Sequence, residues 1–348
     1  DIAQGVAITI QCTHSKLPKF RFLSCVGTRV KKYADLISKK AIDLSLINIK
    51  PAAPYFRWCA DSSNDNQNSK SEYFTWSDIK SIFDVASSGI QTKRDKLCVA
   101  NSSEEIWNRV QLFSSLPEEK ARVEFDLGKD GKGWSIQSAK ADIESYGLNE
   151  RFICPILYRP FDIRYTYWTG ESSGFLGRPR REVMQHIIGH DNLGMIFNRQ
   201  IAGDNISHFG VSRVPICHGT FYLGNKGQDY FAPLYIFDDD LLSSQSHGRS
   251  NIKQSILRKL EEESNGSINN VRPEEFFNYA YGIFYSPIYR SRYAEFLKID
   301  FPRLPLTDKI TLFQKLVQLG GKLVSLHLLE TKIIDNPNAN FFGSSRVV

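Results

Sequence analysis

The order of hydrophobic and polar positions predicts short strands and one helix in the first part of the chain. Apolar and β-branched runs are typical of strands at Val6–Ile10, Phe20–Val26 and Tyr55–Trp58. Apolar side chains recur with helical spacing over Thr28–Lys40, which predicts an amphipathic helix. The polar segment Asp61–Lys70 has nothing to contribute to a core, and we expect an exposed loop there.

The region between residues 77 and 150 is predicted to begin with a helix, and short strands alternate with helices over 87–150. One helix is expected near Ser77–Ala86, with Ser77 as its N-cap, and a second over Ser103–Ser114. The short apolar run Leu97–Val99 is predicted to be a strand. The segment Asp126–Gly133 holds three glycines, and we therefore expect a turn at this place.

Short strands return in the second half of the chain, and helices end it. Strands are predicted at Phe152–Tyr158, Ile163–Trp168, Leu193–Asn198 and Ala232–Ile236. A helix at Arg180–Ile188 interrupts them, and residues 238–270 are polar enough to be partly a mobile loop. Helices are predicted over 273–297 and 307–330. The first should break at Ser286–Pro287, because proline lacks an amide donor and disfavours helix at the preceding residue.

These elements predict a mixed α+β fold, with short, mostly antiparallel or mixed sheets, packed helices and a helical C-terminal part. No internal repeat is visible, and the strands do not follow the long β-α-β rhythm of a parallel sheet. The length of 348 residues suggests two domains, or one large domain with an appendage, since domains usually span about 100–200 residues. The chain starts at Asp1 almost directly within a predicted core strand, so we expect it to be a piece of a longer polypeptide.

The sequence shows no sign of export or of a membrane anchor. No apolar run approaches the roughly 20 residues that a membrane-spanning helix needs, and no secretory signal is found at the start. The six cysteines have neither CxxC spacing nor clustering, which argues against a zinc site and against a disulfide framework. Scattered free thiols fit a reducing compartment, and we expect the protein in the cytoplasm.

Positive charge is concentrated in a stretch that contains arginine but no lysine. The whole chain has a formal net charge of +6, which permits a polyanionic partner without requiring one. Residues 151–220 hold eight arginines and five acidic residues. A planar guanidinium fits phosphate, and it can pair bidentately with guanine. The cluster therefore indicates an interface with nucleic acid, and ordinary surface salt bridges are the alternative.

The arginines at the start of one predicted helix are the first candidates for contacts to the DNA backbone. They are Arg178, Arg180 and Arg181. Amide groups at a helix N-terminus, together with neighbouring guanidiniums, form a phosphate site. We therefore predict that these three side chains bind phosphates of a duplex.

A second group of residues is predicted to read bases. The segment Asn198–Gln200 places three suitable side-chain types together at a strand end, since asparagine or glutamine pairs with adenine and arginine with guanine. The candidates for base contacts are Arg199, Gln200 and Arg213.

A further basic turn lies at Gly89–Asp95. Its glycine allows the backbone to approach a partner closely. Lys93 and Arg94 are candidates for clamping a phosphate, and the alternative is a solvated turn in which Arg94 pairs with Asp95. Aromatic side chains also interleave with Arg159 and Arg164, which fits either base stacking or core packing with exposed guanidiniums.

Several signals of a catalytic centre are incomplete. His186 and His190 have the spacing of a zinc-protease helix, but Ile187 stands in the place of the general-base glutamate. The glycine-rich segment Lys129–Gly133 lacks the spacing of a phosphate-binding loop, and no Gly-x-Ser-x-Gly motif occurs. An adenine methyltransferase would need an Asn/Asp-Pro-Pro-aromatic loop, whereas Asn336–Asn338 has a single proline. We expect no complete catalytic centre and no cofactor in this chain.

Five segments, taken in order, carry a resemblance to a known family. They are Ser88–Asp95, Tyr158–Arg164, Arg178–Met184, Asn198–Gln200 and the long segment Tyr281–Pro305. Together they resemble the C-terminal specificity domain of Type ISP restriction-modification enzymes, and the related Type IIG enzymes share the general layout. Lys93 stands where this family usually has glycine, a departure that bears on the tight turn but is compatible with phosphate contact.

The resemblance implies a division of the chain and a role for it. Residues 1–80 would be the tail of an adenine-N6 DNA methyltransferase domain with a connector, 81–335 the specificity domain, and 336–348 a flexible tail. This domain would bind double-stranded DNA and position the target adenine for the upstream domain, which is its partner in the same polypeptide. S-adenosylmethionine, and ATP with Mg²⁺, are expected only for upstream domains.

Two other interpretations stay open at the level of sequence. The chain is either a fragment that keeps methyltransferase or nuclease activity, or an arginine-rich domain that binds an acidic protein.

Overall fold

The computed structural model describes residues 20–22, 29–38, 47–49, 72–201, 209–221, 227–237 and 248–331. The chain divides into two compact units, Asp1–Glu72 and Tyr73–Val348. Four sequence predictions lie outside the described residues: the strands Val6–Ile10 and Tyr55–Trp58, the loop Asp61–Lys70 and the tail 336–348.

The first unit contains the predicted helix and a pair of short strands. Helix α1 (Arg29–Ser38) falls within the predicted segment Thr28–Lys40, which confirms that prediction. Strand β1 (Phe20–Phe22) pairs antiparallel with β2 (Ile47–Ile49). The sequence had indicated β1 but not β2.

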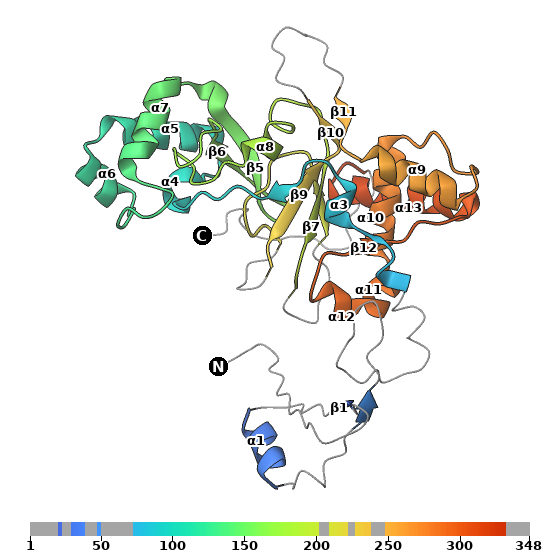
Figure 1. Cartoon of the computed structure of the whole chain (residues 1–348). Coiled ribbons are helices and arrows are strands. Elements are labelled where there is room, and N and C mark those ends of the chain that lie inside the picture. Colours follow the sequence, from blue (N-terminus) through green and yellow to red (C-terminus); the bar gives the residue numbers. More distant parts are fainter. Residues whose placement is uncertain are drawn as a thin grey trace, which may run out of the picture. The chain divides into compact units, whose positions relative to one another are not determined.

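A four-stranded antiparallel sheet lies between two apolar cores in the second unit (Figure 1). Its strand order is β4 (Ser87–Ser88), β9 (Asp229–Pro233), β7 (Gly194–Asn198) and β8 (Gly210–Ser212). Every residue of β7 is buried; Met195 and Phe197 belong to one core, and Ile196 belongs to the other. Because side chains alternate along a strand, a strand between two cores is a continuous apolar run.

Helices and a hairpin cover the core on one side of this sheet, drawn from cyan to green in Figure 1. They are α4 (Asp95–Cys98), α5 (Ser103–Ser115), α6 (Glu118–Glu124), α7 (Ile136–Tyr146), β5 (Ile153–Arg159) and β6 (Asp162–Tyr167), with the 3₁₀ turn η3 (Glu150–Phe152). Helix α5 begins where Ser102 accepts a hydrogen bond of 3.1 Å from the amide of Glu105, and it buries Ile106, Val110 and Phe113. The helix predicted over Ser103–Ser114 is thus confirmed.

A helical layer covers the other core. Its helices α9 (Gln254–Glu263), α10 (Pro273–Tyr285), α11 (Pro287–Arg292), α12 (Ala294–Leu297) and α13 (Ile310–His327) are drawn in orange and red in Figure 1, and α3 (Ile79–Ile82) is drawn in blue. Two small antiparallel sheets join it: β3 (Ser77–Asp78) with β12 (Arg303–Leu304), and β10 (Tyr235–Ile236) with β11 (Arg249–Ser250). Gly320 lets α13 approach α10, since a Cβ there would collide with the backbone of Asn278.

The predicted fold class is confirmed, and most of the predicted strands and helices are present. The break at Ser286–Pro287 is present as well, where the Ser286 hydroxyl accepts a bond of 3.4 Å from the amide of Tyr289 and caps α11. Among the described helices, none combines the length and apolar character needed to cross a membrane.

Three local predictions were wrong. Leu97–Val99 is not a strand, because Leu97 and Cys98 belong to the helical turn α4 and only Val99 is extended. The helix expected over Ser77–Ala86 is the single turn α3, capped by Asp78, since Ser77 pairs with Leu304 in a sheet. Helix Arg180–Ile188 shortens to α8 (Arg181–Met184).

The segment 238–270, expected to be partly a mobile loop, contains β11 and α9 in its described part, and residues 238–247 lie outside the described residues.

Candidate nucleic-acid interface

Two basic segments that are far apart in the sequence form a backbone bridge. The amide of Gln91 donates a bond of 3.0 Å to the carbonyl of Arg178, and the amide of Arg178 donates one of 2.9 Å in return. A pair of residues that exchanges both bonds lies directly opposite in an antiparallel ladder, with both side chains on one face. The two segments predicted to bind phosphate, 89–95 and 178–181, are therefore neighbours.

This bridge is one end of a row of extended segments. Leu157 is bridged to Ile216, and Ile90 is bridged to Cys217, both in the parallel sense. The amide of His218 donates a bond of 2.7 Å to the carbonyl of Ile90. Gly89 is required by this packing, because an added Cβ would lie 2.7 Å from the amide nitrogen of His218. The close approach that the glycine predicted is thus to the chain itself.

We call five residues at this row the basic strip: Gln91, Lys93, Arg178, Arg180 and His218. Lys93 and Arg178 are exposed, and in the part of the chain that the structure describes neither has a carboxylate partner. The pKa of His218 is lowered by burial first, and then by Arg180 and Lys93. Arg180 and Lys93 therefore both lie close enough to His218 to act on its charge, and together they make the strip electropositive.

The tight turn is present at Lys93, although lysine stands here in place of the glycine that the family usually has. Its φ is +66°, in the left-handed region that glycine adopts without cost. Its side-chain Cγ lies over Gly177, where a Cβ would collide with it. The glycine at 177 thus makes room for the lysine, and the lysine head group stays exposed.

The three arginines at α8 differ in how far they are available. Arg178 is exposed, whereas Arg180 has φ +57°, and its side chain, 21% exposed, lies with Nη1 3.9 Å from Glu182. Burial lowers the pKa of Arg180. Arg181 is exposed and its Nε lies 3.4 Å from Gln185 Oε1. Helix α8 is a single turn, so it is too short to provide the phosphate site expected from the amides of a helix N-terminus. The arginine guanidiniums themselves are therefore the candidates for binding phosphate.

Arg94 is engaged inside the protein. It donates bonds of 2.9 Å to the carbonyl of Lys93 and 2.8 Å to the carbonyl of Lys129, and its guanidinium lies 4.7 Å from the ring centre of Trp134. Asp95, the partner that the alternative reading gave it, instead accepts bonds from Thr92 and Tyr158. Arg94 therefore positions the turn next to Lys93.

Arg199 and Gln200 lie at the end of β7 where β4 leaves the sheet. The Nε of Arg199 lies 3.5 Å from Asp300, and its guanidinium is 5.9 Å from the ring of Phe301. Gln200 donates a bond of 3.0 Å to the carbonyl of Ile299. Both side chains are therefore held by one segment at the surface. Asn198, which the sequence grouped with them, is buried and donates to Asp229, so it does not reach a base.

Arg213 lies at the opposite end of β7, because Ser212 pairs with Gly194. Its Nε is 2.6 Å from one oxygen of Glu330, and its Nη1 is 3.4 Å from Asp191. These carboxylates raise the pKa of Arg213. The structure thus separates Arg213 from Arg199 and surrounds it with acidic groups.

The sequence did not single out Gln91 or Lys80. Gln91 lies in the strip between Arg178 and His218, and among the described residues its side-chain amide has no hydrogen-bond partner. Lys80 is exposed, with its Nζ 5.3 Å from the ring of Tyr230 and 5.9 Å from that of Phe301. Neither has a local sequence signal, since only long-range pairing brings them to this surface.

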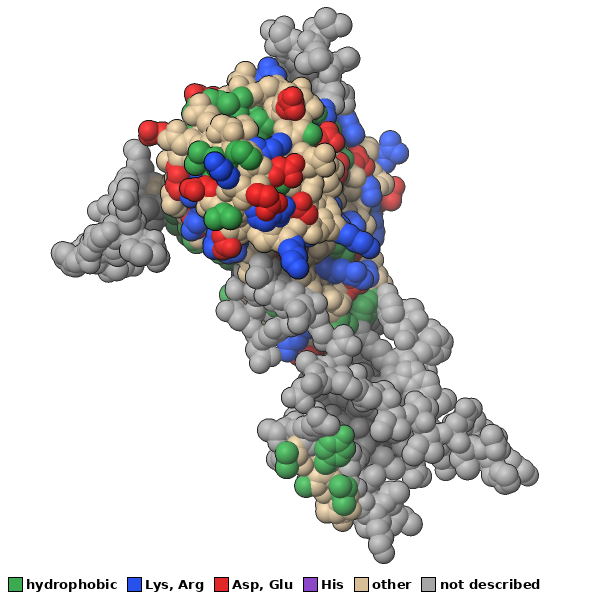
Figure 2. All heavy atoms as spheres, turned by 90° about the vertical axis from the view of Figure 1, so that its left-hand side faces the viewer, with side chains coloured by type: hydrophobic (Ala, Val, Ile, Leu, Met, Phe, Trp, Pro, Cys, Tyr) green, Lys and Arg blue, Asp and Glu red, His purple; other side chains and the backbone are tan. Residues whose placement is uncertain are grey.

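The surface over α5, α6 and α7 mixes acidic and basic side chains (Figure 2). Ion pairs account for part of it, such as Lys96–Asp126 at 2.5 Å and Arg122–Asp130 at 3.1 Å. Alternating charge of this kind does not attract a polyanion as a field of one sign does. The basic strip is therefore the better candidate surface.

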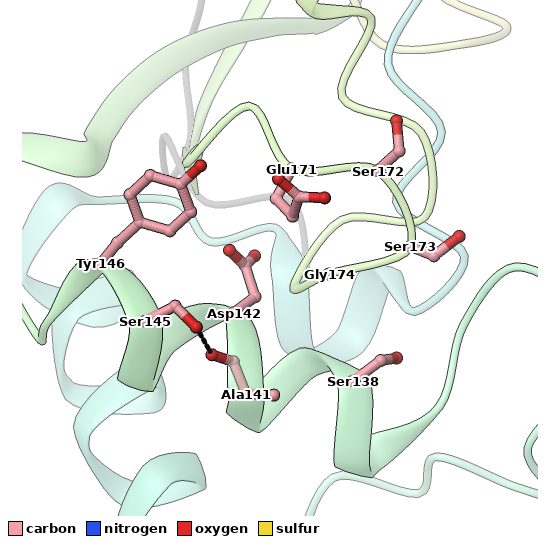
Figure 3. A pocket seen from close by; sticks show the side chains of 9 residues that line it. All are labelled: Ser138, Ala141, Asp142, Ser145, Tyr146, Glu171, Ser172, Ser173 and Gly174. Carbon is pink, nitrogen blue, oxygen red and sulfur yellow. Dashed lines mark hydrogen bonds between the residues drawn. The ribbon is translucent and has the colours of Figure 1, made fainter.

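A pocket between α7 and the loop 169–175 is acidic (Figure 3). The carboxylates of Asp142 and Glu171 both lie at it, together with Tyr146 and several serines. Asp142 Oδ2 accepts bonds of 2.9 Å from Thr169 and 2.8 Å from the amide of Phe175. Burial raises the pKa of Asp142. Phosphate would be repelled here, and Asp142 instead fixes the loop that leads to Arg178.

A family model describes this part of the chain. The model of the Type ISP C-terminal specificity domain matches residues 81–343, which include the whole basic strip. The chain belongs to this family. No curated protein matches the sequence of this specificity domain.

Solved structures share the fold of the specificity domain. They include a DrdV–DNA complex, with a TM-score of 0.57 and 20% identity over 86% of this chain and 29% of that chain. The ATP-dependent Type ISP restriction-modification enzyme LlaBIII bound to DNA gives 0.58 and 20%, over 82% and 18%. A nuclease-deletion mutant of the Type ISP restriction-modification enzyme LlaGI, with a DNA substrate mimic, gives 0.53 and 23%, over 86% and 27%. This chain spans less than a third of each of them.

Proposed function

We propose that this specificity domain recognises a target sequence in double-stranded DNA through the basic strip and the neighbouring end of β7. It would thereby position an adenine for N6 methylation by another domain of a longer polypeptide. The observation that carries the proposal is the bridge between Gln91 and Arg178, which joins two basic segments on one surface. The three structures with a similar fold are complexes with DNA or a DNA mimic, which supports the same partner.

Contacts to phosphates are assigned to four cations of this surface, namely Lys93, Arg178, Arg180 and Arg181. Lys93 and Arg178 are exposed without a carboxylate partner among the described residues, and Arg181 is exposed at the same turn. Arg180 is 21% exposed at its side chain, and its Nε has no hydrogen-bond partner among the described residues. These four side chains would set the register of the domain on the duplex.

Base reading is assigned to the polar side chains beside these cations. Arg199 is held by a surface pair at 3.5 Å, which is worth little and can be exchanged for a base. Gln200 and Gln91 carry amides that suit adenine. Arg94 and Arg213 are proposed as supports, because each is already engaged with internal partners.

No cofactor is proposed for the chain itself. Among the described residues, no group of three or more His, Cys, Asp or Glu side chains is placed to hold a metal ion. S-adenosylmethionine, and ATP with Mg²⁺, are proposed only for other domains of the polypeptide. A cytoplasmic location is proposed because Cys98, Cys154 and Cys217 are buried free thiols, which fits a reducing compartment.

Salt-dependent binding tests the proposal. The 348-residue chain is titrated with duplex DNA retained from a random pool, and affinity is measured over a range of salt concentrations. We expect the log–log slope to be about −0.9 per phosphate contact, and Arg178→Ala to make it shallower by about 1. Lys322→Ala on α13 removes the same charge from another exposed site and should leave the slope unchanged. Equal effects of both variants, or no retention at low salt, would overturn the proposal.

A further inference from the structure

The tip of the β5–β6 hairpin exposes an aromatic side chain in an unfavourable backbone conformation. Arg159 pairs with Asp162, so Pro160 and Phe161 form a two-residue turn. Phe161 has φ +63°, and 64% of it is exposed. A positive φ at the second turn position is typical of turns that prefer glycine or asparagine there.

Nothing in the described part of the chain compensates for this conformation. A bulky residue in the left-handed region is a genuine outlier, and such strain persists mainly where it serves a function. The ring of Phe161 has no stacked, edge-on or cationic neighbour there, and Ile163 beside it is also exposed, at 47%. The tip therefore presents apolar surface to solvent at an energetic cost.

Next to the turn, the guanidiniums of two arginines lie over the ring of one tyrosine. The guanidinium of Arg159 lies 4.1 Å from the ring centre of Tyr158, and that of Arg164 lies 4.4 Å from it. Arg164 is paired with Asp162 at 3.0 Å, whereas Arg159 has no carboxylate partner among the described residues. A cation without a carboxylate partner among the described residues thus lies two residues from Phe161 in the chain.

The hairpin is fixed next to the basic strip. The hydroxyl of Tyr158 donates a bond of 2.8 Å to Asp95, two residues from Lys93. On the other edge, the amide of Cys217 donates a bond of 3.0 Å to the carbonyl of Leu157. Arg159 is also close enough to Cys217 to lower the pKa of its thiol, against the larger effect of burial. The hairpin is therefore linked by hydrogen bonds to Asp95 and Cys217, on the two segments that carry Lys93 and His218.

We propose that Phe161 is a wedge that enters the base stack of the bound duplex, with Arg159 on the adjacent phosphate. The proposal rests on the proposed function, since it requires a duplex on the basic strip. Apolar side chains inserted between base pairs unstack them and kink the helix, and the unstacking is offset by the contacts that a bent duplex gains. An adenine that must leave the stack for methylation would leave more easily beside such a wedge.

A docking site for another protein domain is the competing role for an exposed phenylalanine. The charges favour DNA, because the cations around the tip that lack carboxylate partners among the described residues are Lys93, Arg159 and Arg178. A protein partner would need a matching acidic patch as well as an apolar pocket.

The test uses the whole 348-residue chain and variants of the hairpin. The probes are duplexes of the sequence that the chain selects from a random pool, each carrying 2-aminopurine at one position. Its fluorescence rises when the base loses its stacking partner. Variants Phe161→Ala and Phe161→Gly are compared with Ile163→Ala, a matched change of an exposed apolar side chain on the same hairpin.

We expect the wild-type chain to raise fluorescence several-fold at one or two adjacent positions. Both Phe161 variants should abolish that rise and weaken binding about tenfold, while Ile163→Ala keeps both. Phe161→Gly should also raise the midpoint of thermal unfolding by a few degrees, because it relieves the positive φ. A stabilised variant that fails to unstack DNA cannot be explained by misfolding.

The outcomes separate the wedge from the proposed function. If both Phe161 variants raised the fluorescence as much as the wild-type chain does, the wedge would be overturned, and DNA binding by the strip would stand. The wedge would also be overturned, and the proposed function kept, if Arg178→Ala lost affinity for DNA while the Phe161 variants still unstacked the base. A chain that binds no duplex even at low salt would overturn the proposed function and the wedge together.

Discussion

Arg94 donates a hydrogen bond of 2.8 Å from Nη2 to the carbonyl oxygen of Lys129. The same guanidinium donates to the carbonyl of Lys93 and lies over the ring of Trp134. The basic strip is thereby fastened to the loop 126–133, which closes the neighbouring core. Arg94 thus stabilises the turn through contacts within the protein, and the side chain of its neighbour Lys93 stays exposed and able to bind the duplex.

Replacing Arg94 by alanine should destabilise the domain. Hydrogen bonds from a charged donor contribute about 1.5–3 kcal/mol each, and we expect a loss of about 2 kcal/mol in the free energy of unfolding, measured with urea. Arg178→Ala is the control and should change stability by less than about 0.5 kcal/mol, because its side chain is exposed. A stable Arg94→Ala chain with a shallower salt slope would instead assign Arg94 to a phosphate.

Replacing Lys93 by glycine should have opposite effects on folding and binding. The left-handed conformation costs a side-chain-bearing residue about 1 kcal/mol, so Lys93→Gly should unfold at higher urea concentration. The salt slope of DNA binding should become shallower by about 1, because one phosphate contact is lost.

Lys93→Ala separates the two effects of that substitution. It removes the same charge but keeps a Cβ at positive φ, so it should lower the slope without raising stability. If Lys93→Gly proved less stable than the wild type, the packing of the lysine stem on Gly177 would outweigh the backbone strain.

Local signals in the sequence were enough for elements with their own periodicity or caps. Helix α5 has Ser102 before it and an apolar face of i, i+4 and i+7 type, and β7 is an apolar run with the length of a strand. The run Leu97–Val99 was misassigned because three apolar residues carry no period, and helix or strand would bury them equally. Tertiary contacts decided between them.

The site could be predicted only as a composition, not as a surface. The excess of arginine in 151–220 indicated DNA, but the bridge between Gln91 and Arg178 is a long-range pairing that no local motif encodes. The same holds for the support roles. Arg213 looks equivalent to Arg199 in sequence, yet only Arg213 meets Glu330, which lies 117 residues further on.

Arg199→Ala and Arg180→Ala should differ in the kind of binding they lose. Arg199→Ala is expected to relax specificity at one base pair by about 1–3 kcal/mol, because a bidentate contact to a base would be lost. Arg180→Ala should weaken binding to all sequences alike, because phosphate contacts carry no sequence information. Selection from a random pool, followed by sequencing and titration, measures both effects.

Arg213→Ala is the control for this comparison. Its partners Glu330 and Asp191 would lose their cation, which costs about 1 kcal/mol or less for a surface pair. The selected sequence should stay the same. A change in the selected sequence, or identical behaviour of Arg199→Ala and Arg180→Ala, would contradict the assignment of roles.

Asp142→Asn should change how stability depends on pH. Burial raises the pKa of Asp142 in the folded state, so the folded chain binds this proton more tightly than the unfolded chain. The stability gained from protonation is fully present below the unfolded pKa of about 4, and it is lost as pH rises through the folded pKa. Asparagine can keep the acceptor for Thr169 and for the amide of Phe175, but it does not titrate. Urea unfolding is measured at pH 4 and pH 7, and the wild type should lose stability relative to Asp142→Asn as the pH rises. The opposite trend would mean that the loop leading to Arg178 requires the ionised carboxylate.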